Sequence, residues 1–288
     1  MGIIVHNEAK NIRTILDSAL KQKLNQVEIS EIIVVSSGSS DDTNNIVTSL
    51  TTNNPKIKLL TEEKRNGKAS GVNIFIKNAK NNVLVLSSGD LLLKEDCVEK
   101  LCIPFINSNV GMTGVHSIPV NDINTFWGYA AHILWELHHQ VSLKNPKMGE
   151  MVAFRRCFES LDKTTSMDEA SIELLIKHNN LEVVYVPDAI IYNRSPSKLS
   201  EFIAVRRRNF SGHISIKNEM KYEVATLNLS GLIQLIPLVI DFTPKHLLYT
   251  FLTAAIEVYS RLLGYLDYKF GLKQHVIWET AHTARSIN

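Results

Sequence analysis

The sequence predicts an α/β fold with a Rossmann-like, mostly parallel sheet and crossover helices, and three patterns support this prediction. Short apolar runs rich in Ile and Val, such as residues 32–35, have the length of strands buried on both faces. Segments with helical periodicity separate these runs, as connections between parallel strands require. Small and acidic residues follow several of the runs, and ligands bind at the carboxyl ends of strands in open α/β sheets.

The individual elements follow in order from these patterns. The second apolar run leads into a hydroxyl-rich turn at residues 36–40, and the residues from Asp41 to Thr43 can cap a helix. A later helix begins at Asp168 and continues with apolar residues at helical spacing. The expected strands cover residues 3–5, 31–35, 57–61, 83–87, 110–117, 151–155 and 182–187. The expected helices cover residues 9–22, 41–52, 68–80, 94–106, 124–143, 168–179 and 198–218.

Length and composition fit one large α/β core with an appendage. The 288 residues are 44% hydrophobic and carry a formal net charge of +2, which argues against a nucleic-acid partner. The 3 cysteines match neither a zinc site nor a disulfide framework, so we expect reduced thiols. Because no leader-like segment precedes the first strand, we expect the catalytic part in the cytoplasm. A change in composition separates an α/β domain over residues 1–224 from an apolar helical region over residues 225–288.

Several short segments, taken together, resemble the family 2 glycosyltransferases, which have the GT-A fold. These segments are residues 3–12, 31–43, 64–73, 83–90, 149–156, 167–170 and 206–208. They extend over roughly the first three quarters of the chain, which makes chance similarity a poor explanation. The resemblance implies that a sugar moves from a nucleotide-sugar donor to a hydroxyl acceptor with inversion. It also implies a divalent cation, Mg2+ or Mn2+, as the cofactor.

On the donor side, the resemblance assigns the nucleotide to residues that follow the first two strands. Asn7 and Glu8 end the first strand, and Ser36 stands where the family has the acidic residue that contacts the base. Ser37 replaces the next acid, so Asp41 alone remains of the usual acidic set. We therefore expect a hydroxyl or backbone group to contact the base. For Asp41, an ordinary carboxylate at a helix start is the alternative.

The fourth expected strand ends at the position of the family's Asp-x-Asp motif. Ser88 occupies the first acidic place and Asp90 the second, which implies Asp90 as the metal ligand. One carboxylate can suffice, because a hard cation bound to a diphosphate keeps most of its waters. Lys68, after Gly67, resembles the family's basic contact near the donor phosphates. The alternatives are a turn aspartate for Asp90 and a solvated lysine for Lys68.

Asp168 and Glu169 stand where the family has the acid pair that contains the catalytic base. An inverting transfer needs a carboxylate that takes the proton of the acceptor hydroxyl. A helix start lowers the pKa of a carboxyl group, so burial must restore its basicity. The order of the two acids is reversed here: register favours Glu169, and residue identity favours Asp168. A plain capping pair is the remaining alternative.

The acceptor side is indicated by residues 149–156, which resemble a segment of the family that lies ahead of the base. The segment begins with Gly149 and ends in two arginines, so we assign Gly149 and Arg155 to the acceptor side. Trp135, on the helix expected over residues 124–143, could line a path for the acceptor. Packing is the alternative for this side chain.

Residues 206–208 are three arginines at the place where processive members carry Gln-x-x-Arg-Trp. Arg208 matches the arginine of that motif, whereas Val205 and Asn209 replace its outer residues. A guanidinium contact with the product diphosphate is therefore expected, and the inference of processivity is weakened. A solvated basic helix face is the alternative.

Two apolar segments, residues 229–240 and 246–265, lie in the C-terminal region. Polar residues interrupt both, so neither is a clean run of the roughly 18 residues that a transmembrane helix needs. Glu257 and Arg261 are spaced to pair on a helix, which favours a helix that lies in the membrane interface. We therefore expect a membrane surface as a partner. A helical cap packed on the first domain, or a dimer contact, is the alternative.

The resulting hypothesis is an inverting, metal-dependent glycosyltransferase at the cytoplasmic face of a membrane, with a lipid-linked or glycan acceptor. Two other classes stay open. A catalytically inactive GT-A scaffold is one, because serines replace acids at Ser36, Ser37 and Ser88. A sugar nucleotidyltransferase is the other, because it shares the sheet topology and the nucleotide site.

Overall fold

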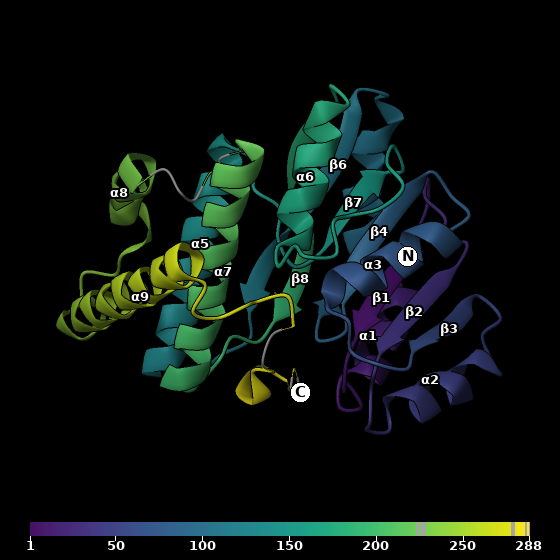
Figure 1. The fold of residues 1–288 in the computed structure, drawn as a ribbon, viewed down its shortest axis with the longest axis horizontal. Coiled ribbons are helices and arrows are strands. Elements are labelled where there is room, and N and C mark those ends of the chain that lie inside the picture. Colours follow the sequence, from purple (N-terminus) through teal and green to yellow (C-terminus); the bar gives the residue numbers. More distant parts are fainter. Residues whose placement is uncertain (223–224, 226–228, 278–279, 286, 288) are drawn as a thin grey trace.

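The computed structural model describes residues 1–222, 225, 229–277, 280–285 and 287. Its centre is a sheet whose described strands have the order β3-β2-β1-β4-β7-β6-β8-β5 (Figure 1). The strands β3, β2, β1 and β4 are parallel, as are β6 and β8, whereas β7 and β5 run antiparallel to their neighbours. The mostly parallel sheet is thus confirmed. The strands are β1 (Gly2–Val5), β2 (Ile32–Ser37), β3 (Ile57–Glu62), β4 (Val83–Ser88), β5 (Leu92–Leu93), β6 (Val110–Pro119), β7 (Val152–Arg155) and β8 (Glu182–Asn193).

Helices cover both faces of the sheet, because alternate residues of each strand point to opposite faces. Ile3 and Val34 pack in the core cluster with α1, α2 and α4, whereas Ile4 and Val35 pack with α3 and α6. The α-helices of the described chain are α1 (Ile12–Leu20), α2 (Thr43–Thr51), α3 (Lys68–Asn78), α4 (Cys97–Cys102), α5 (Phe126–Lys144), α6 (Asp168–His178), α7 (Leu199–Met220), α8 (Leu229–Val239) and α9 (Pro244–Phe270).

The structure contains the expected strands and helices, with three differences. The short strand β5 was not predicted, and the strand expected over residues 182–187 continues to Asn193. The helix expected over residues 94–106 is split into α4 and the 3-10 helix η1 (Ile103–Ile106). The split occurs at Pro104, because proline has no N–H to continue the α-helical hydrogen bonds.

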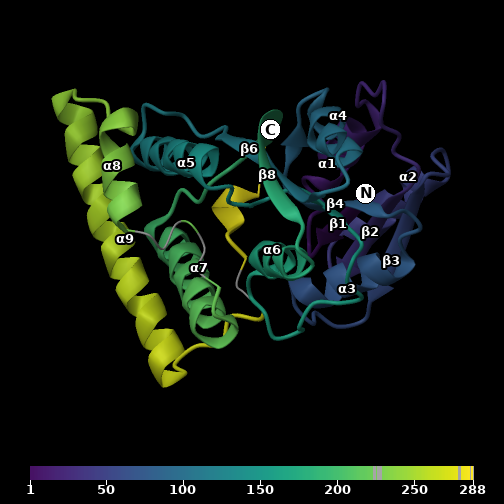
Figure 2. The ribbon, with the colours of Figure 1, turned by 90° about the horizontal axis from the view of Figure 1, so that it is seen from above.

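The C-terminal helices α8 and α9 form an outer layer on α5 and α7, at the end of the molecule away from β2 and β3 (Figures 1 and 2). None of the described helices is both long enough and apolar enough to cross a membrane. The expected pair is present in α9, where Arg261 Nε lies 3.3 Å from Glu257 Oε2. The predicted domain boundary at residue 224 lies outside the described residues.

Beyond α9, the described residues 271–277 and 280–285 form a tail that returns to the sheet, and Asp267 anchors its start. The buried Asp267 carboxylate accepts hydrogen bonds from Arg207 of α7 and from His275 of the tail, the latter at 2.8 Å. Burial alone would raise the pKa of Asp267, but these two partners lower it below its usual value. Further along, the Val276 carbonyl approaches Gly67, where φ is +88° and a Cβ would lie 2.8 Å from that oxygen. Glycine is therefore required at this contact.

We expect Asp267→Asn to lower the free energy of unfolding by about 2 kcal/mol at pH 7, because hydrogen bonds between charged groups are lost. Urea denaturation measures this, with the exposed Asp188→Asn as the control. The folded-state pKa lies below the unfolded value, so the stabilisation is present above about pH 4 and is lost as the pH falls further. Equal unfolding free energies for variant and wild type at pH 7 would exclude this anchoring role.

Candidate functional site

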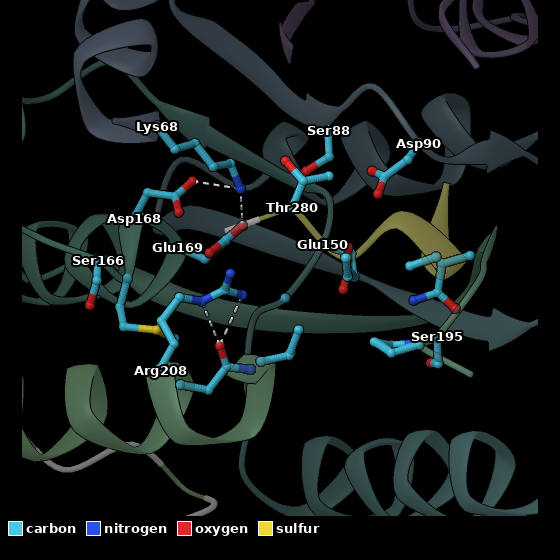
Figure 3. A pocket seen from close by; sticks show the side chains of 18 of the residues that line it. Lys68, Ser88, Asp90, Glu150, Ser166, Asp168, Glu169, Ser195, Arg208 and Thr280 are labelled. Atoms are coloured by element: carbon cyan, nitrogen blue, oxygen red, sulfur yellow. Dashed lines mark hydrogen bonds and ion pairs between the residues drawn. The ribbon is translucent and has the colours of Figure 1, made fainter. Parts of the chain in front are cut away.

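A cavity of about 370 Å³ lies where the carboxyl ends of β1 and β4 meet α3, α5, α6, α7 and the tail. This is the edge of the sheet at which the sequence predicts ligand binding. Nine predicted site residues line the cavity together, and several are drawn in Figure 3. They are Glu8, Lys68, Ser88, Asp90, Trp135, Gly149, Asp168, Glu169 and Arg208.

Lys68 binds both members of the predicted acid pair (Figure 3). Its Nζ lies 2.9 Å from Asp168 Oδ2 and 2.7 Å from Glu169 Oε1. Lys68 is the first residue of α3 and Asp168 is the first residue of α6, so the starts of two helices meet at the cavity. The ammonium group offsets part of the repulsion between the two carboxylates.

The two acids differ in burial and in pKa. The Asp168 side chain is only 3% exposed, and burial together with repulsion from Glu169 raises its pKa to about 7. The Glu169 side chain is 15% exposed. Burial acts to raise the pKa of Glu169, but the ion pair with Lys68 outweighs it and lowers the pKa below its usual value. Glu169 is thus the acid that stays ionised and is more open to the cavity.

Glu8, Asp90 and Glu150 form an acidic group in the same cavity. Burial, with the charge of Asp90, raises the pKa of Glu8 and that of Glu150 to about 7 each. Burial also raises the pKa of Asp90. Glu150 was not predicted, although it directly follows Gly149. Its φ of 55° is in the left-handed region, which non-glycine residues rarely adopt and which is frequent at functional sites.

These three carboxylates would suit a divalent cation that takes most of its coordinating oxygens from a bound ligand and water rather than from the protein. Burial raises the pKa values of these carboxylates in spite of the nearby cations Lys68, Arg208 and Arg285, and a divalent cation would lower the values again. Among the residues that the structure describes, no group of three or more His, Cys, Asp or Glu side chains could hold a metal ion. A cation at Asp90 would therefore take most of its ligands from a diphosphate and water. Such an all-oxygen set suits Mg2+ or Mn2+.

Among the arginines that line the cavity, Arg208 and Arg285 come from distant parts of the chain. Burial lowers the pKa of Arg208 on α7 to about 10, although Glu169 and Glu150 act in the opposite direction. Arg285 of the tail lies with its Nε 3.2 Å from Glu8 Oε1. No sequence signal indicated Arg285, because its segment matches no motif and its partner lies at the other end of the chain.

Asn7, Ser36 and Asp41 do not line the cavity and instead tie the loops after β1 and β2 together. Asn7 Oδ1 accepts a hydrogen bond from the Ser40 N–H at 2.7 Å, and Asp41 Oδ2 accepts one from the Ala9 N–H at 3.0 Å. The hydroxyl of Ser36 is buried and donates to a neighbouring hydroxyl at 2.8 Å. These contacts keep the loops in place, and donor binding by the three residues stays a prediction.

Arg155 lies apart from the cavity, so its position gives no support to the acceptor role. Its guanidinium donates to the backbone carbonyls of Val110 and Phe105, both at 2.7 Å. The reason is the direction of β7, which runs antiparallel to β4 and pairs Arg155 with Val83 at the start of that strand. The cavity lies at the opposite end of β4, after Ser88.

Comparisons with known proteins agree with this arrangement. The sequence matches the family model for glycosyl transferase family 2 over residues 2–165. The mannosyltransferase PcManGT from Pyrobaculum calidifontis, in complex with GDP-Man and Mn2+, has a TM-score of 0.68 at 17% identity, with 94% of this chain and 87% of that chain covered. Glucosyl-3-phosphoglycerate synthase from Mycobacterium tuberculosis, in complex with Mg2+ and UDP, has a TM-score of 0.51 at 16% identity, with 74% of this chain and 77% of that chain covered. No curated protein matches the sequence.

The structural similarities show a shared GT-A-like fold, and the family match covers more than half of the 288 residues. Of the classes that the sequence left open, the family match supports the transferase. The chain belongs to glycosyl transferase family 2 and is a glycosyltransferase.

Proposed function

We propose that the protein transfers a sugar from a nucleotide-sugar donor to a hydroxyl acceptor with inversion, in a reaction that depends on a divalent cation. The observation that carries this proposal is the ion cluster of Lys68, Asp168 and Glu169 in the same cavity as Asp90. It combines a candidate base with a candidate cation ligand. The ligands of the similar structures, GDP-Man with Mn2+ and UDP with Mg2+, support this type of donor and cofactor.

In this proposal the residues of the cavity have separate tasks. Asp90 would hold the cation, which supplies positive charge to the departing diphosphate. Glu169, kept ionised by Lys68, takes the proton of the acceptor hydroxyl. At the same time the oxygen of that hydroxyl bonds to the anomeric carbon of the donor sugar, and the bond between this carbon and the diphosphate breaks. Arg208 and Arg285 would bind anionic oxygens of the donor.

We expect Asp90→Ala to weaken cation-dependent donor binding at least about tenfold. Even residues that only hydrogen-bond to a metal ligand contribute about 10–100-fold to metal affinity, and Asp90 would bind the cation directly. Isothermal titration with UDP-, GDP- and dTDP-sugars, with and without Mg2+ or Mn2+, measures this. Asp42→Asn is a matched control, since Asp42 is exposed and does not line the cavity. Unchanged affinity and unchanged metal dependence in Asp90→Ala would disprove the assignment.

We expect Glu169→Gln to reduce turnover by about 100-fold to 10,000-fold and to leave donor affinity nearly unchanged, because a base acts on the acceptor proton. Asp168→Asn, which alters the more buried acid, should retain more activity. Release of the free nucleotide in the presence of acceptor measures turnover. A larger loss in Asp168→Asn would reverse the assignment. Near-full transfer by both variants would exclude the proposed base mechanism.

We further propose that α9 binds the cytoplasmic face of a membrane, where a lipid-linked or glycan acceptor would be presented. Phe251 and Val258 on its outer surface are 70% and 69% exposed, and other large apolar residues continue the stripe at helical spacing. An exposed apolar stripe of this kind marks an interaction surface. Lys245 and Lys269 lie over aromatic rings at opposite ends of α9, where they would meet anionic head groups.

We expect the full chain to float with anionic liposomes at low and high salt, and Phe251→Ser/Val258→Ser/Leu262→Ser to lose about tenfold or more of this binding, because each apolar side chain adds about 1.5–3 kcal/mol. Ile106→Ser/Ile123→Ser/Leu199→Ser is the control, since it removes exposed apolar residues elsewhere. The full chain is required, because several residues of the tail, Val276 and Arg285 among them, line the cavity. A protein that stays monodisperse without lipid and does not float would instead support the packed helical cap.

A further inference from the structure

A second, smaller cavity of about 90 Å³ lies between α5, α7 and α9. Six of the described residues line both this cavity and the large one, and four of them carry basic side chains. These four are His138, Lys147, Arg206 and His213, and we call them the basic annex. The donor-side residues Lys68, Ser88 and Asp90 line only the large cavity. The small cavity can hold several water molecules and is therefore large enough for a small polar group.

The walls of the small cavity carry more positive than negative charge. Lys147, Arg206 and Arg261 are cationic, whereas Glu257 is the only carboxylate among the described lining residues. Arg206 and Arg261 share this carboxylate, with distances of 3.0 Å and 3.3 Å to Glu257 Oε2. In the described part of the chain, the Lys147 ammonium forms neither a hydrogen bond nor an ion pair. One half-buried cation at the cavity wall is therefore left without a direct partner among the described residues.

The surroundings of Lys147 and His138 would suit a bound anion. Burial and the charge of Arg206 lower the pKa of Lys147 to about 8, in spite of the opposite effect of nearby glutamates. His138 Nε2 is buried and has no hydrogen-bond partner among the described residues. Gly149 leaves space beside this nitrogen, since a Cβ there would lie 3.5 Å from it. Crowded cations in a poorly hydrated site are costly unless an anion neutralises them.

From this geometry we infer that the basic annex binds a phosphate group carried by the acceptor. The inference rests on the proposed sugar transfer, because the annex opens into the cavity that contains Glu169. The annex lies on the side of α9 rather than at Asp90, so it is separate from the donor side. A phosphate attached to a lipid and a phosphate on a soluble polyol share this chemistry.

The test compares ligands with and without phosphate. Isothermal titration of the metal-free protein would use octyl phosphate against octanol, and glycerol 3-phosphate against glycerol, with inorganic phosphate as the minimal probe. We expect each phosphate compound to bind at least about tenfold more tightly than its neutral counterpart, since charge-assisted contacts are strong. Tighter binding of octyl phosphate than of glycerol 3-phosphate would identify a lipid source, and the reverse order a soluble one. Equal binding of phosphate and neutral compounds would overturn the inference.

Variants show whether the binding occurs in the annex. Lys147→Met should weaken phosphate binding about tenfold, and Lys147→Arg should restore it. Lys144→Met is the matched control, because this exposed lysine ends α5 and lies outside both cavities. His138→Phe, which keeps a ring and removes Nε2, gives an independent measurement if Lys147→Met does not fold. Wild-type affinity in folded Lys147→Met, or in folded His138→Phe if Lys147→Met does not fold, would overturn the inference.

Failure of this inference can be distinguished from failure of the proposed transfer. Hydrolysis of the nucleotide-sugar without any acceptor, measured in the wild type and Lys144→Met, reports on the donor reaction alone. If the donor is hydrolysed and phosphate compounds do not bind, the annex is not a phosphate site. If phosphate compounds bind through Lys147 and no nucleotide-sugar is bound or hydrolysed, the proposed function fails and the annex stands.

Discussion

The ion cluster of Lys68 with Asp168 and Glu169 is the interaction on which the site depends. It joins residues that are up to 101 positions apart and fixes the start of α6 against the start of α3. Without the ammonium group, the repulsion between the two carboxylates would be stronger and the pKa of Asp168 would be higher still. Leaving a buried charge uncompensated costs about 3–5 kcal/mol, a large share of the roughly 5–15 kcal/mol that stabilises a typical protein. One contact therefore sets the position of a helix and the ionisation of the candidate base.

Acidic and basic residues gather at different ends of the cavity. The acidic group at Glu8, Asp90 and Glu150 lies toward the ends of β1 and β4, whereas the basic annex lies toward α5, α7 and α9. Fields of opposite sign at the two ends orient ligands before they make contact. A donor that arrives with its cation and an acceptor that carries an anion would therefore enter in different orientations. The ion cluster lies in the cavity that connects these two regions.

The strand ends were predictable from sequence, and the contacts between distant segments were not. Lys68, Asp90 and Glu169 were predicted from their resemblance to family motifs. Each follows a strand or starts a helix, and parallel strands bring their carboxyl ends to one edge. Arg155 lies apart from the cavity, and the sequence carries no sign that β7 reverses direction. Lys147 and Arg285 could not be found either, because their role depends on how the outer helices and the tail pack, which local patterns do not encode.

The contact of Arg285 with the start of the chain has a consequence for how the protein forms. Its guanidinium donates to the backbone carbonyl of His6 at 2.7 Å and also to that of Asn7, across 278 positions of sequence. Contacts between residues so far apart in sequence require closure of a very long loop. Helices and neighbouring strands can form before this closure, but they cannot make the contact themselves. During synthesis from the N-terminus, the sheet and its helices can assemble while residue 285 is still absent. The end of the cavity beside Glu8 is therefore completed last, so a newly made chain has its sheet before it has a finished site.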